Sequence, residues 1–161
     1  MTRGGAGRRP HGRPAGPARI GRRPRIAPAA LARRQTLELE APAPALLAGN
    51  EVLLGVLVRN LLDNALRYSP PGATIAASVQ ALSTGVLLRV QDSGPGMSEE
   101  QMSHLGERFY RVLGSDQPGS GLGWSIVRRI AAAHGARIEL RRSALLGGLD
   151  VSVHWPAATP T

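Results

Sequence analysis

The run Asp92-Ser-Gly-Pro-Gly96 combines a carboxylate with glycines that let the backbone approach a ligand closely. Val86, Leu88 and Val90 alternate along the strand that precedes it. Asp92 continues this period, so we expect its side chain on the same inward face. A buried carboxylate is costly without a partner, and the exocyclic N6 amino group of adenine is a suitable donor. The same five residues also make a good turn, so the run alone leaves both interpretations open.

Two asparagines, Asn60 and Asn64, lie four residues apart where the apolar spacing predicts a helix over residues 50–68. At about 100° per residue, the pair shares one arc with Arg67 and Tyr68, opposite most of the leucines. Asparagine is a poor helix former, so the pair suggests a function, although an ordinary solvated face is the alternative. A carboxamide oxygen can ligate Mg²⁺ while its nitrogen donates to a phosphate oxygen, and an arginine adds a permanent cation.

A second glycine loop, Gly119-Ser-Gly-Leu-Gly123, precedes a helix predicted over residues 125–134. Backbone N–H groups at the start of a helix carry partial positive charge and bind anions, so this loop suits phosphates. It is not a P-loop, because the chain contains no lysine, and no clear strand runs into it as in a Rossmann fingerprint. By itself the loop is a weak signal.

Helices interleaved with β-hairpins must position these residues. Alternating polar and apolar residues predict a strand at 36–40 and two hairpins, one of strands 75–81 and 86–90 and one of strands 137–141 and 149–155. A short helix is expected from Ser98, and Gly135 is placed to cap the helix that ends at 134. Ala41-Pro-Ala-Pro44 should break the chain after the first strand. This order predicts an α/β fold, a two-layer sandwich of a mixed β-sheet with helices on one face.

The basic residues are concentrated at the start of the chain of 161 residues. Residues 1–36 hold ten arginines and no acid, whereas residues 37–161 have a net charge of −1. We expect residues 1–35 to be a disordered leader, because Arg, Pro and Gly bury too little apolar surface to offset the ordering entropy. Such a leader can bind nucleic acid or anionic lipid, but it lacks aromatic residues for base stacking. We therefore expect a solvated leader and no nucleic-acid partner.

Composition also excludes several classes of protein. The absence of cysteine excludes disulfides and thiolate metal sites. No run of about 18 apolar residues is present, so we expect no membrane segment. No apolar stretch follows the basic start, which argues against a secretory signal. We expect one ordered domain over residues 36–156, followed by a short tail at 157–161.

Four motifs, in order, resemble those of sensor histidine kinases. Asn60-Leu-Leu-Asp-Asn64-Ala-Leu-Arg-Tyr68-Ser-Pro resembles their N box, and Asp92-Ser-Gly-Pro-Gly96 resembles their G1 box. Glu107-Arg-Phe-Tyr-Arg111 is similar to the F box, and Gly119-Ser-Gly-Leu-Gly-Trp-Ser-Ile-Val127 to the G2 box. The resemblance covers about residues 36–156. It implies the Bergerat-type ATP-binding fold that these kinases share with gyrase, mismatch-repair ATPases and a heat-shock chaperone.

The resemblance implies that the chain binds ATP and Mg²⁺. The implied ATP-binding residues are Asn60, Asn64, Arg67, Tyr68, Asp92, Gly94, Gly96, Arg108, Phe109, Arg111, Ser120, Gly121, Leu122 and Gly123. Asn64 would ligate Mg²⁺, and Asp92 would accept a hydrogen bond from adenine N6, with Gly94 and Gly96 beside the ring. Residues 97–118 would form a lid that orders over the nucleotide, and its arginines would reach the γ-phosphate.

In the gyrase and chaperone relatives, a glutamate at the position of Asn60 activates water. An asparagine cannot take the proton, so the resemblance favours phosphoryl transfer to an acceptor over fast hydrolysis. Asn60 and Arg67 would then lie near the phosphates, and Tyr68 against the base or ribose. The backbone amides of Gly121, Leu122 and Gly123 would bind the phosphates.

We expect the phosphoacceptor histidine of such kinases to be missing here. None of His11, His104, His134 and His154 lies in a helical context followed by an acid and Pro-Leu. The chain should therefore be an ATP module without a catalytic residue of its own, from a truncated or frame-shifted gene. Its partners would be a histidine-containing dimerisation hairpin and a response regulator. We expect a monomer, because dimerisation runs through that hairpin, and a location in the bacterial cytoplasm.

Two other functions fit the same motifs. One is a stand-alone serine kinase that acts as an anti-sigma factor, within the same superfamily. The other is a catalytically inactive module that uses nucleotide only to shape a surface for a partner. The Arg-Tyr-Ser-Pro ending of the N box and the F box favour the histidine kinase.

Overall fold

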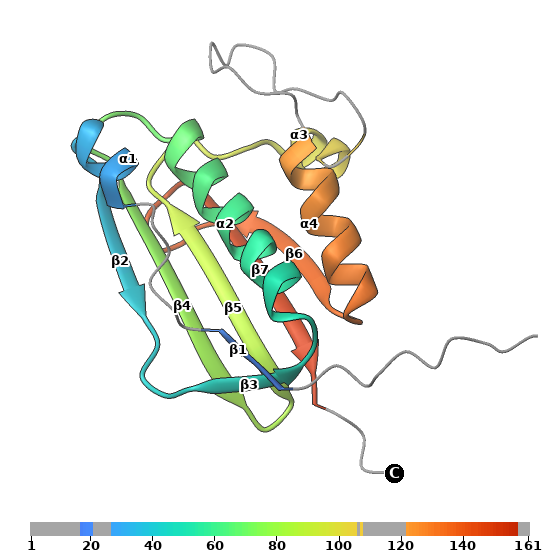
Figure 1. The fold of residues 1–161 in the computed structure, drawn as a ribbon. Coiled ribbons are helices and arrows are strands. Elements are labelled where there is room, and N and C mark those ends of the chain that lie inside the picture. Colours follow the sequence, from blue (N-terminus) through green and yellow to red (C-terminus); the bar gives the residue numbers. More distant parts are fainter. Residues whose placement is uncertain (1–16, 21–26, 106, 108–121, 158–161) are drawn as a thin grey trace, which may run out of the picture.

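The computed structural model describes residues 17–20, 27–105, 107 and 122–157, which form a β-sheet layer covered by helices (Figure 1). The strands are β1 (Pro17–Ile20), β2 (Thr36–Glu40), β3 (Ala45–Ala48), β4 (Thr74–Leu82), β5 (Gly85–Asp92), β6 (Arg137–Arg142) and β7 (Leu149–Pro156). The helices are α1 (Ala27–Ala32), α2 (Glu51–Tyr68), α3 (Glu99–His104) and α4 (Leu122–Ala133).

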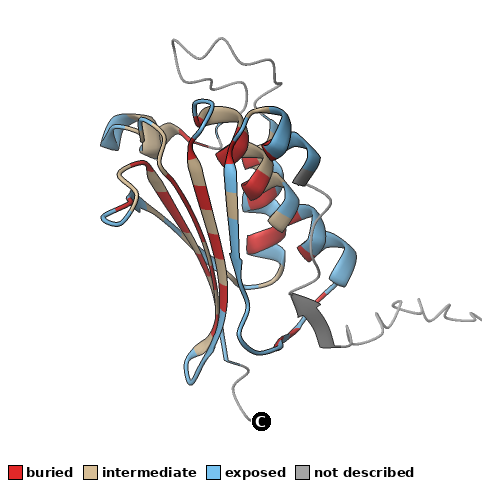
Figure 2. Cartoon of the chain, turned by 90° about the vertical axis from the view of Figure 1, so that its left-hand side faces the viewer, coloured by how far each residue is buried: buried red, intermediate tan, exposed pale blue. Residues whose placement is uncertain are grey.

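The main sheet has five strands in the order β2-β4-β5-β7-β6. β2 runs parallel to β4, whereas the other neighbours are antiparallel, so the sheet is mixed. β1 and β3 form a separate antiparallel pair. The two long helices, α2 and α4, lie on the same face of the main sheet (Figures 1 and 2). The predicted two-layer sandwich with helices on one face is confirmed.

The core lies between this face of the sheet and the two helices, where Figure 2 shows the buried residues. Alternate residues of β4 and β5 point into it, including Ile75 and Leu88. The leucine face of α2 packs from the other side, and Leu57 is completely buried. Val127 of α4 is buried in the same cluster. Burial of each such side chain contributes about 1.5–3 kcal/mol, so this layer supplies most of the stability.

Local capping signals set where the site-bearing helices begin. The Asn50 side chain accepts hydrogen bonds from the backbone N–H groups of Val52 and Leu53 at the start of α2. The predicted short helix from Ser98 is present as α3, and Ser98 and Gln101 form a reciprocal capping box there. Both helices begin where the polar capping residues of the sequence place them.

The structure differs from the sequence-based expectation at three elements near the start of the chain. β1 and α1 lie within the stretch that we expected to be disordered, and β3 directly follows the expected break. β1 pairs with β3 along its full length, a contact between distant segments that leaves no local pattern. α1 buries Ala30, which is only 3 % exposed. Ordered structure therefore begins before residue 36, and the division into leader and domain stays a prediction.

The carboxyl end of α2 is closed by the segment that leads into β2. The last carbonyls of a helix lack partners within it, and the prolines that follow α2 cannot donate. The Gln35 side-chain nitrogen donates to the carbonyls of Leu66, at 2.9 Å, and Ser69, at 3.0 Å. Arg33 Nη1 also donates to the Leu66 carbonyl, at 2.6 Å. These bonds fix the end of the helix that carries Asn64, Arg67 and Tyr68.

Candidate nucleotide-binding site

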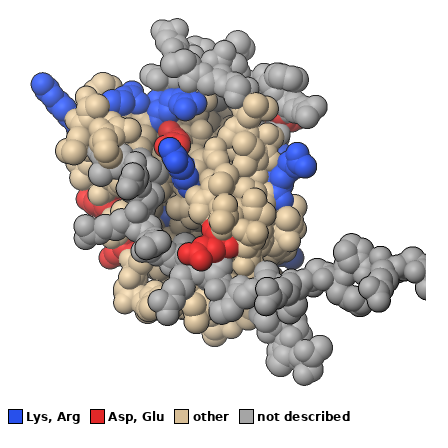
Figure 3. Space-filling model, viewed as in Figure 1, with Lys and Arg blue, Asp and Glu red and all other residues tan. Residues whose placement is uncertain are grey.

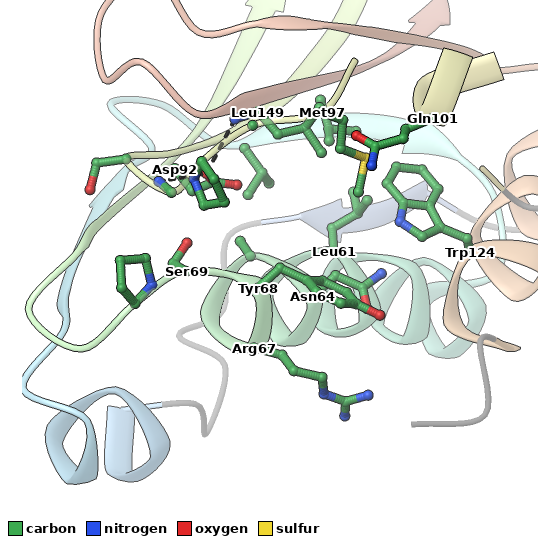
Figure 4. A pocket seen from close by; sticks show the side chains of 18 of the residues that line it. Leu61, Asn64, Arg67, Tyr68, Ser69, Asp92, Met97, Gln101, Trp124 and Leu149 are labelled. Carbon is green, nitrogen blue, oxygen red and sulfur yellow. Dashed lines mark hydrogen bonds between the residues drawn. The ribbon is translucent and has the colours of Figure 1, made fainter. Parts of the chain in front are cut away.

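A cavity of about 970 Å³ opens between the carboxyl half of α2, the loop that follows β5 and the first turn of α4. Sites for small molecules and cofactors in proteins commonly have volumes up to roughly this size. Of the residues expected to bind nucleotide, those that line the cavity are Asn64, Arg67, Tyr68, Asp92, Gly94 and Gly96. In Figure 4, α2 forms one side of the cavity and Asp92 lies on the opposite side.

Asp92 lies at the end of β5 and is 7 % exposed, on the inward face that the strand period predicts. Its Oδ1 accepts hydrogen bonds from the backbone N–H groups of Gly94, at 2.9 Å, and Leu149, at 3.2 Å. Burial raises the pKa of the Asp92 carboxyl above its ordinary range, and the two backbone bonds only partly oppose this shift. The carboxylate is thus oriented by the backbone and still lines the cavity as an acceptor.

The turn between β6 and β7 holds Asp92 in place. The backbone N–H of Gly148 donates to the Asp92 carbonyl at 3.0 Å, and the Ser143 N–H donates to the Gly148 carbonyl at 2.7 Å. A Cβ at Gly148 would overlap both Asp92 Oδ1 and the Asp92 carbonyl oxygen. Only glycine allows this close approach, so Gly148 is a positioning residue of the site. The sequence predicted only a hairpin of strands 137–141 and 149–155 here, with no role for Gly148 in the site.

Gly94 and Gly96 shape the loop next to Asp92. A Cβ at Gly94 would lie 3.0 Å from Asp92 Oδ1 and 3.2 Å from Ser69 Oγ. Gly96 has a φ of 73°, in the left-handed region that favours glycine. Neither position carries a side chain, which leaves room for a flat ring beside this part of the loop.

The asparagines of α2 lie beside the first turn of α4. A Cβ at Gly123 would lie 3.1 Å from Asn60 Oδ1 and 3.5 Å from Asn64 Oδ1. The Asn64 side-chain nitrogen is buried and has no hydrogen-bond partner among the described residues. Asn60 does not line the cavity, and its nitrogen donates to the Val56 carbonyl at 2.8 Å. The structure therefore brings the end of the second glycine loop to both asparagines and leaves a donor of Asn64 free.

Arg67 and Tyr68 lie on the cavity wall at the end of α2. In Figure 4 the Arg67 side chain extends away from Asp92. Basic side chains gather along the upper edge of the face shown in Figure 3, where α1 and the end of α2 lie. Arg33, just after α1, also lines the cavity. This side of the cavity is therefore positively charged, which suits an anionic ligand.

Part of the expected site lies outside the described residues. These are Arg108, Phe109, Arg111, Ser120 and Gly121, together with positions 106 and 108–118 of the expected lid. Leu122 and Gly123 are described, at the start of α4, which begins three residues earlier than expected. Leu122 is exposed, whereas Trp124 is buried.

Several lining residues were not among those expected to bind nucleotide. They are mainly apolar and form the inner surface of the cavity: Leu61, Val90, Met97, Trp124, Leu149 and Val151. The alternation along β5 did place Val90 on the inward face, but the sequence did not show which inward residues border the cavity. Ser69 and Gln101, which are polar, also line it. The chemistry of the cavity is therefore an apolar floor with a few directed polar groups, as in most cofactor sites.

The burial of Asp92 predicts a pH-dependent stability in the nucleotide-free protein. Because the pKa of Asp92 is raised on folding, the folded protein binds this proton more tightly than the unfolded chain does. The contribution of Asp92 to stability is then present at low pH and is lost as the pH rises through the folded-state pKa. At neutral pH, Asp92→Asn should therefore be more stable than the wild type, because asparagine removes the buried charge.

Urea unfolding of both proteins over a pH series measures this effect. The stability difference should shrink towards zero below about pH 4, where aspartate is protonated in the unfolded chain as well. An Asp92→Asn variant that is equally or less stable at neutral pH would contradict the assignment of a desolvated carboxylate.

The protein has an α/β fold in which a mixed sheet is covered by helices on one face. A cavity large enough for a nucleotide lies between the sheet and these helices. The catalytic domain of histidine kinase ThkA shares this fold, with a TM-score of 0.70 and 20% sequence identity over 81% of this chain and 85% of that one. The family model of histidine kinase-, DNA gyrase B- and HSP90-like ATPases matches residues 49–159, more than half of the chain. The chain belongs to this family, and its domain is accordingly an ATP-binding one.

The relatives include several bacterial sensor proteins. Sensor protein QseC of Salmonella typhi is 49% identical over 107 residues, which cover 66% of this chain and 23% of QseC. Sensor protein kinase PmrB of Pseudomonas aeruginosa is 39% identical over 113 residues, or 70% of this chain and 24% of PmrB. The structure of the mycobacterial sensor histidine kinase MprB aligns with a TM-score of 0.72 and 28% identity, over 81% of this chain and 90% of that one. The chain spans about a quarter of the length of the curated relatives.

Within the described residues, no helix is both long and apolar enough to cross a lipid bilayer.

Proposed function

We propose that this chain is the Mg²⁺-ATP-binding catalytic domain of a two-component sensor histidine kinase. It donates the γ-phosphate of ATP to a histidine on a separate dimerisation hairpin. One observation carries the proposal: Asp92, with its buried carboxylate, and Asn64, whose side-chain nitrogen has no partner among the described residues, line one cavity from opposite sides. The family match and the sensor kinases among the relatives support the same reaction.

The adenine end of the site is formed by Asp92, Gly94 and Gly96. Asp92 Oδ1 is already oriented by two backbone N–H groups, so the carboxylate can accept from adenine N6 without rearrangement. Guanine presents an oxygen at the equivalent position, which a carboxylate repels. The glycines lie beside the ring, and Tyr68 borders the base or the ribose. The site therefore selects ATP over GTP.

The phosphate end fits Mg²⁺ held mainly through the nucleotide. Among the described residues, no three His, Cys, Asp or Glu side chains gather to hold a metal. Mg²⁺ commonly takes one or two protein oxygens together with phosphates and water, so the Asn64 oxygen is a sufficient protein ligand. Its free nitrogen then donates to a phosphate oxygen. Bound Mg²⁺ would neutralise phosphate charge during transfer.

The remaining phosphate contacts come from the glycine loop and the lid. The first N–H groups of α4 have no carbonyl partners within the helix and lie next to the asparagines, so they suit phosphate oxygens. Gly121, Leu122 and Gly123 would supply these amides. Ser120, Gly121 and the lid residues Arg108, Phe109 and Arg111 lie outside the described residues, and the two arginines would reach the γ-phosphate.

The chemistry at Asn60 favours transfer over hydrolysis. The Asn60 nitrogen donates to the Val56 carbonyl, and neither carboxamide atom can accept a proton from water at neutral pH. Without a base to activate water, transfer to the acceptor histidine is the favoured reaction. In this step the γ-phosphorus forms a bond to an imidazole nitrogen while its bond to the ADP oxygen breaks. The imidazole proton passes to solvent. Positioning and charge neutralisation supply most of the catalysis of such a step.

Titration of the full chain with Mg²⁺-ATP, with Mg²⁺-GTP as the control, tests the binding half of this proposal. The transfer half is tested by adding a purified dimerisation hairpin with a phosphoacceptor histidine and following transfer from γ-labelled ATP. Acid-labile label on the hairpin supports the histidine kinase. ATP binding without transfer to any supplied hairpin would favour a nucleotide-dependent binding module.

Asn64→Ala should chiefly remove the Mg²⁺ dependence of ATP binding. The wild type should bind ATP about tenfold or more tightly with Mg²⁺ than with EDTA, because the metal links Asn64 to the phosphates. The variant should bind ATP with similar affinity under both conditions, since alanine offers no oxygen ligand.

Asn50→Ala is a suitable control, because Asn50 caps the far end of the same helix. This control should retain the Mg²⁺ response despite a loss of about 1 kcal/mol in stability. An undiminished Mg²⁺ response in Asn64→Ala would show that Asn64 does not ligate the metal.

The partners would be a histidine-containing dimerisation domain and a response regulator. A cytoplasmic location follows from the use of ATP. One structural neighbour, the cytoplasmic segment of histidine kinase QseC, is consistent with it, at 31% identity and a TM-score of 0.58 over 81% of this chain and 66% of that one.

A further inference from the structure

Ser69 carries a buried hydroxyl on the wall of the cavity that has no evident structural use. The residue caps the carboxyl end of α2 and is 1 % exposed. Its Oγ has no hydrogen-bond partner within the part of the chain that the structure describes. Buried hydroxyl groups in folded proteins nearly always have a partner, because an unpaired one loses its bonds to water. A ligand bound in the cavity could supply the partner that Ser69 Oγ lacks.

The Ser69 hydroxyl and the Asp92 carboxylate face the same part of the cavity. A Cβ at Gly94 would lie 3.2 Å from Ser69 Oγ and 3.0 Å from Asp92 Oδ1, so both side chains border the same part of the loop that follows β5. In Figure 4 the Ser69 hydroxyl points from the end of α2 towards the side that carries Asp92. A flat ligand that reaches Asp92 therefore presents its adjacent edge atoms to Ser69.

The backbone of Ser69 is held rigidly. Gln35 donates to the Ser69 carbonyl at 3.0 Å and to the Pro70 carbonyl at 3.2 Å. Pro70 and Pro71 follow directly and restrict the chain on that side. The hydroxyl is thus presented from a fixed position, so a bond to a ligand requires little further ordering.

We propose that Ser69 is a second base-recognition residue, whose hydroxyl donates a hydrogen bond to N1 of adenine, directly or through one water. The inference rests on the proposed function, in which Asp92 accepts from the neighbouring N6 amino group. N6 and N1 are adjacent on the same edge of adenine, one a donor and the other an acceptor. The pair Asp92 and Ser69 offers the complementary acceptor and donor. A hydroxyl can also accept, so Ser69 adds affinity, while discrimination against guanine depends on Asp92.

A double cycle of protein and ligand changes tests this contact. ATP and 1-deaza-ATP, in which a C–H group replaces N1, are titrated into the wild type and into Ser69→Ala. Ser69→Ala should weaken ATP binding about five- to tenfold, the effect of one neutral hydrogen bond. The wild type should lose a similar factor with 1-deaza-ATP. The variant should bind the two nucleotides almost equally, because the bond is already absent.

Ser152→Ala is the matched control, since Ser152 lies on β7 outside the cavity lining, and it should bind both nucleotides as the wild type does. If Ser69→Ala prefers ATP over 1-deaza-ATP by the same factor as the wild type does, the two changes act independently, and this result would overturn the inference. If Ser69→Ala does not fold, Ser69→Cys carries the same test, because a thiol keeps the volume but is a weaker donor. A wild type that binds no ATP at all would instead overturn the proposed function.

Discussion

Asp92→Asn is expected to weaken ATP binding by about 100-fold, or about 3 kcal/mol. Asparagine is nearly the same size as aspartate, so the cavity keeps its shape. The carboxamide oxygen remains with the N–H groups of Gly94 and Leu149, because these two donors orient it. The carboxamide nitrogen then faces adenine N6, and two donors meet in a buried site. The loss of affinity arises from this mismatch and from the loss of the charged acceptor.

Calorimetric titration of wild type and variant with Mg²⁺-ATP measures the effect. Asp63→Asn is the matched control, because Asp63 is a half-exposed residue of α2 that does not line the cavity and forms a surface ion pair with Arg59. It should change affinity less than twofold, since a surface ion pair contributes little. Unchanged ATP affinity in Asp92→Asn would refute the role of Asp92.

Asp92→Asn is expected to change ATP affinity and folding stability in opposite directions. Since burial raises the pKa of Asp92, the carboxylate destabilises the empty protein at neutral pH. Asp92→Asn should therefore be a weaker binder and a more stable protein at once. A loss of affinity together with a loss of stability would point to misfolding instead of a mismatched base contact.

The sequence was informative where a regular pattern continued into the site. The period-2 alternation of Val86, Leu88 and Val90 fixed the face on which Asp92 lies, and the structure confirms its burial. The helical spacing placed Asn60 and Asn64 on one side of α2, and both lie near Gly123. Periodicity predicts these positions because every residue of a strand or helix obeys the same geometry.

The sequence was uninformative where a contact joins distant segments. β1 pairs with β3, and Gln35 closes the end of α2, yet neither segment carries a regular pattern. The hydroxyl of Ser69, unpartnered among the described residues, is also a result of tertiary packing, since the sequence after α2 shows only that the prolines end the helix. Such residues become visible only when burial and hydrogen-bond partners are known.

Gly148→Ala should impair both the site and the fold. A Cβ at this position would overlap Asp92 Oδ1 and the Asp92 carbonyl oxygen, so either β7 or the end of β5 must shift. Overpacking of this kind commonly costs about 1–3 kcal/mol of stability. Because the carboxylate itself is displaced, ATP affinity should fall at least about tenfold in the molecules that remain folded, as for the loss of one hydrogen bond to a charged group.

Gly147→Ala provides the comparison that isolates the contact with Asp92. Gly147 has a φ of 87°, so alanine is strained there, but a Cβ would meet no atom within 4 Å. This variant should lose about 1–2 kcal/mol of stability and keep its affinity for ATP. Thermal unfolding and ATP titration of both variants give the two quantities separately. Equal ATP affinity in Gly148→Ala and Gly147→Ala would mean that the turn between β6 and β7 does not position Asp92. A loss of ATP affinity in Gly148→Ala but not in Gly147→Ala would show that this turn positions Asp92 for base recognition.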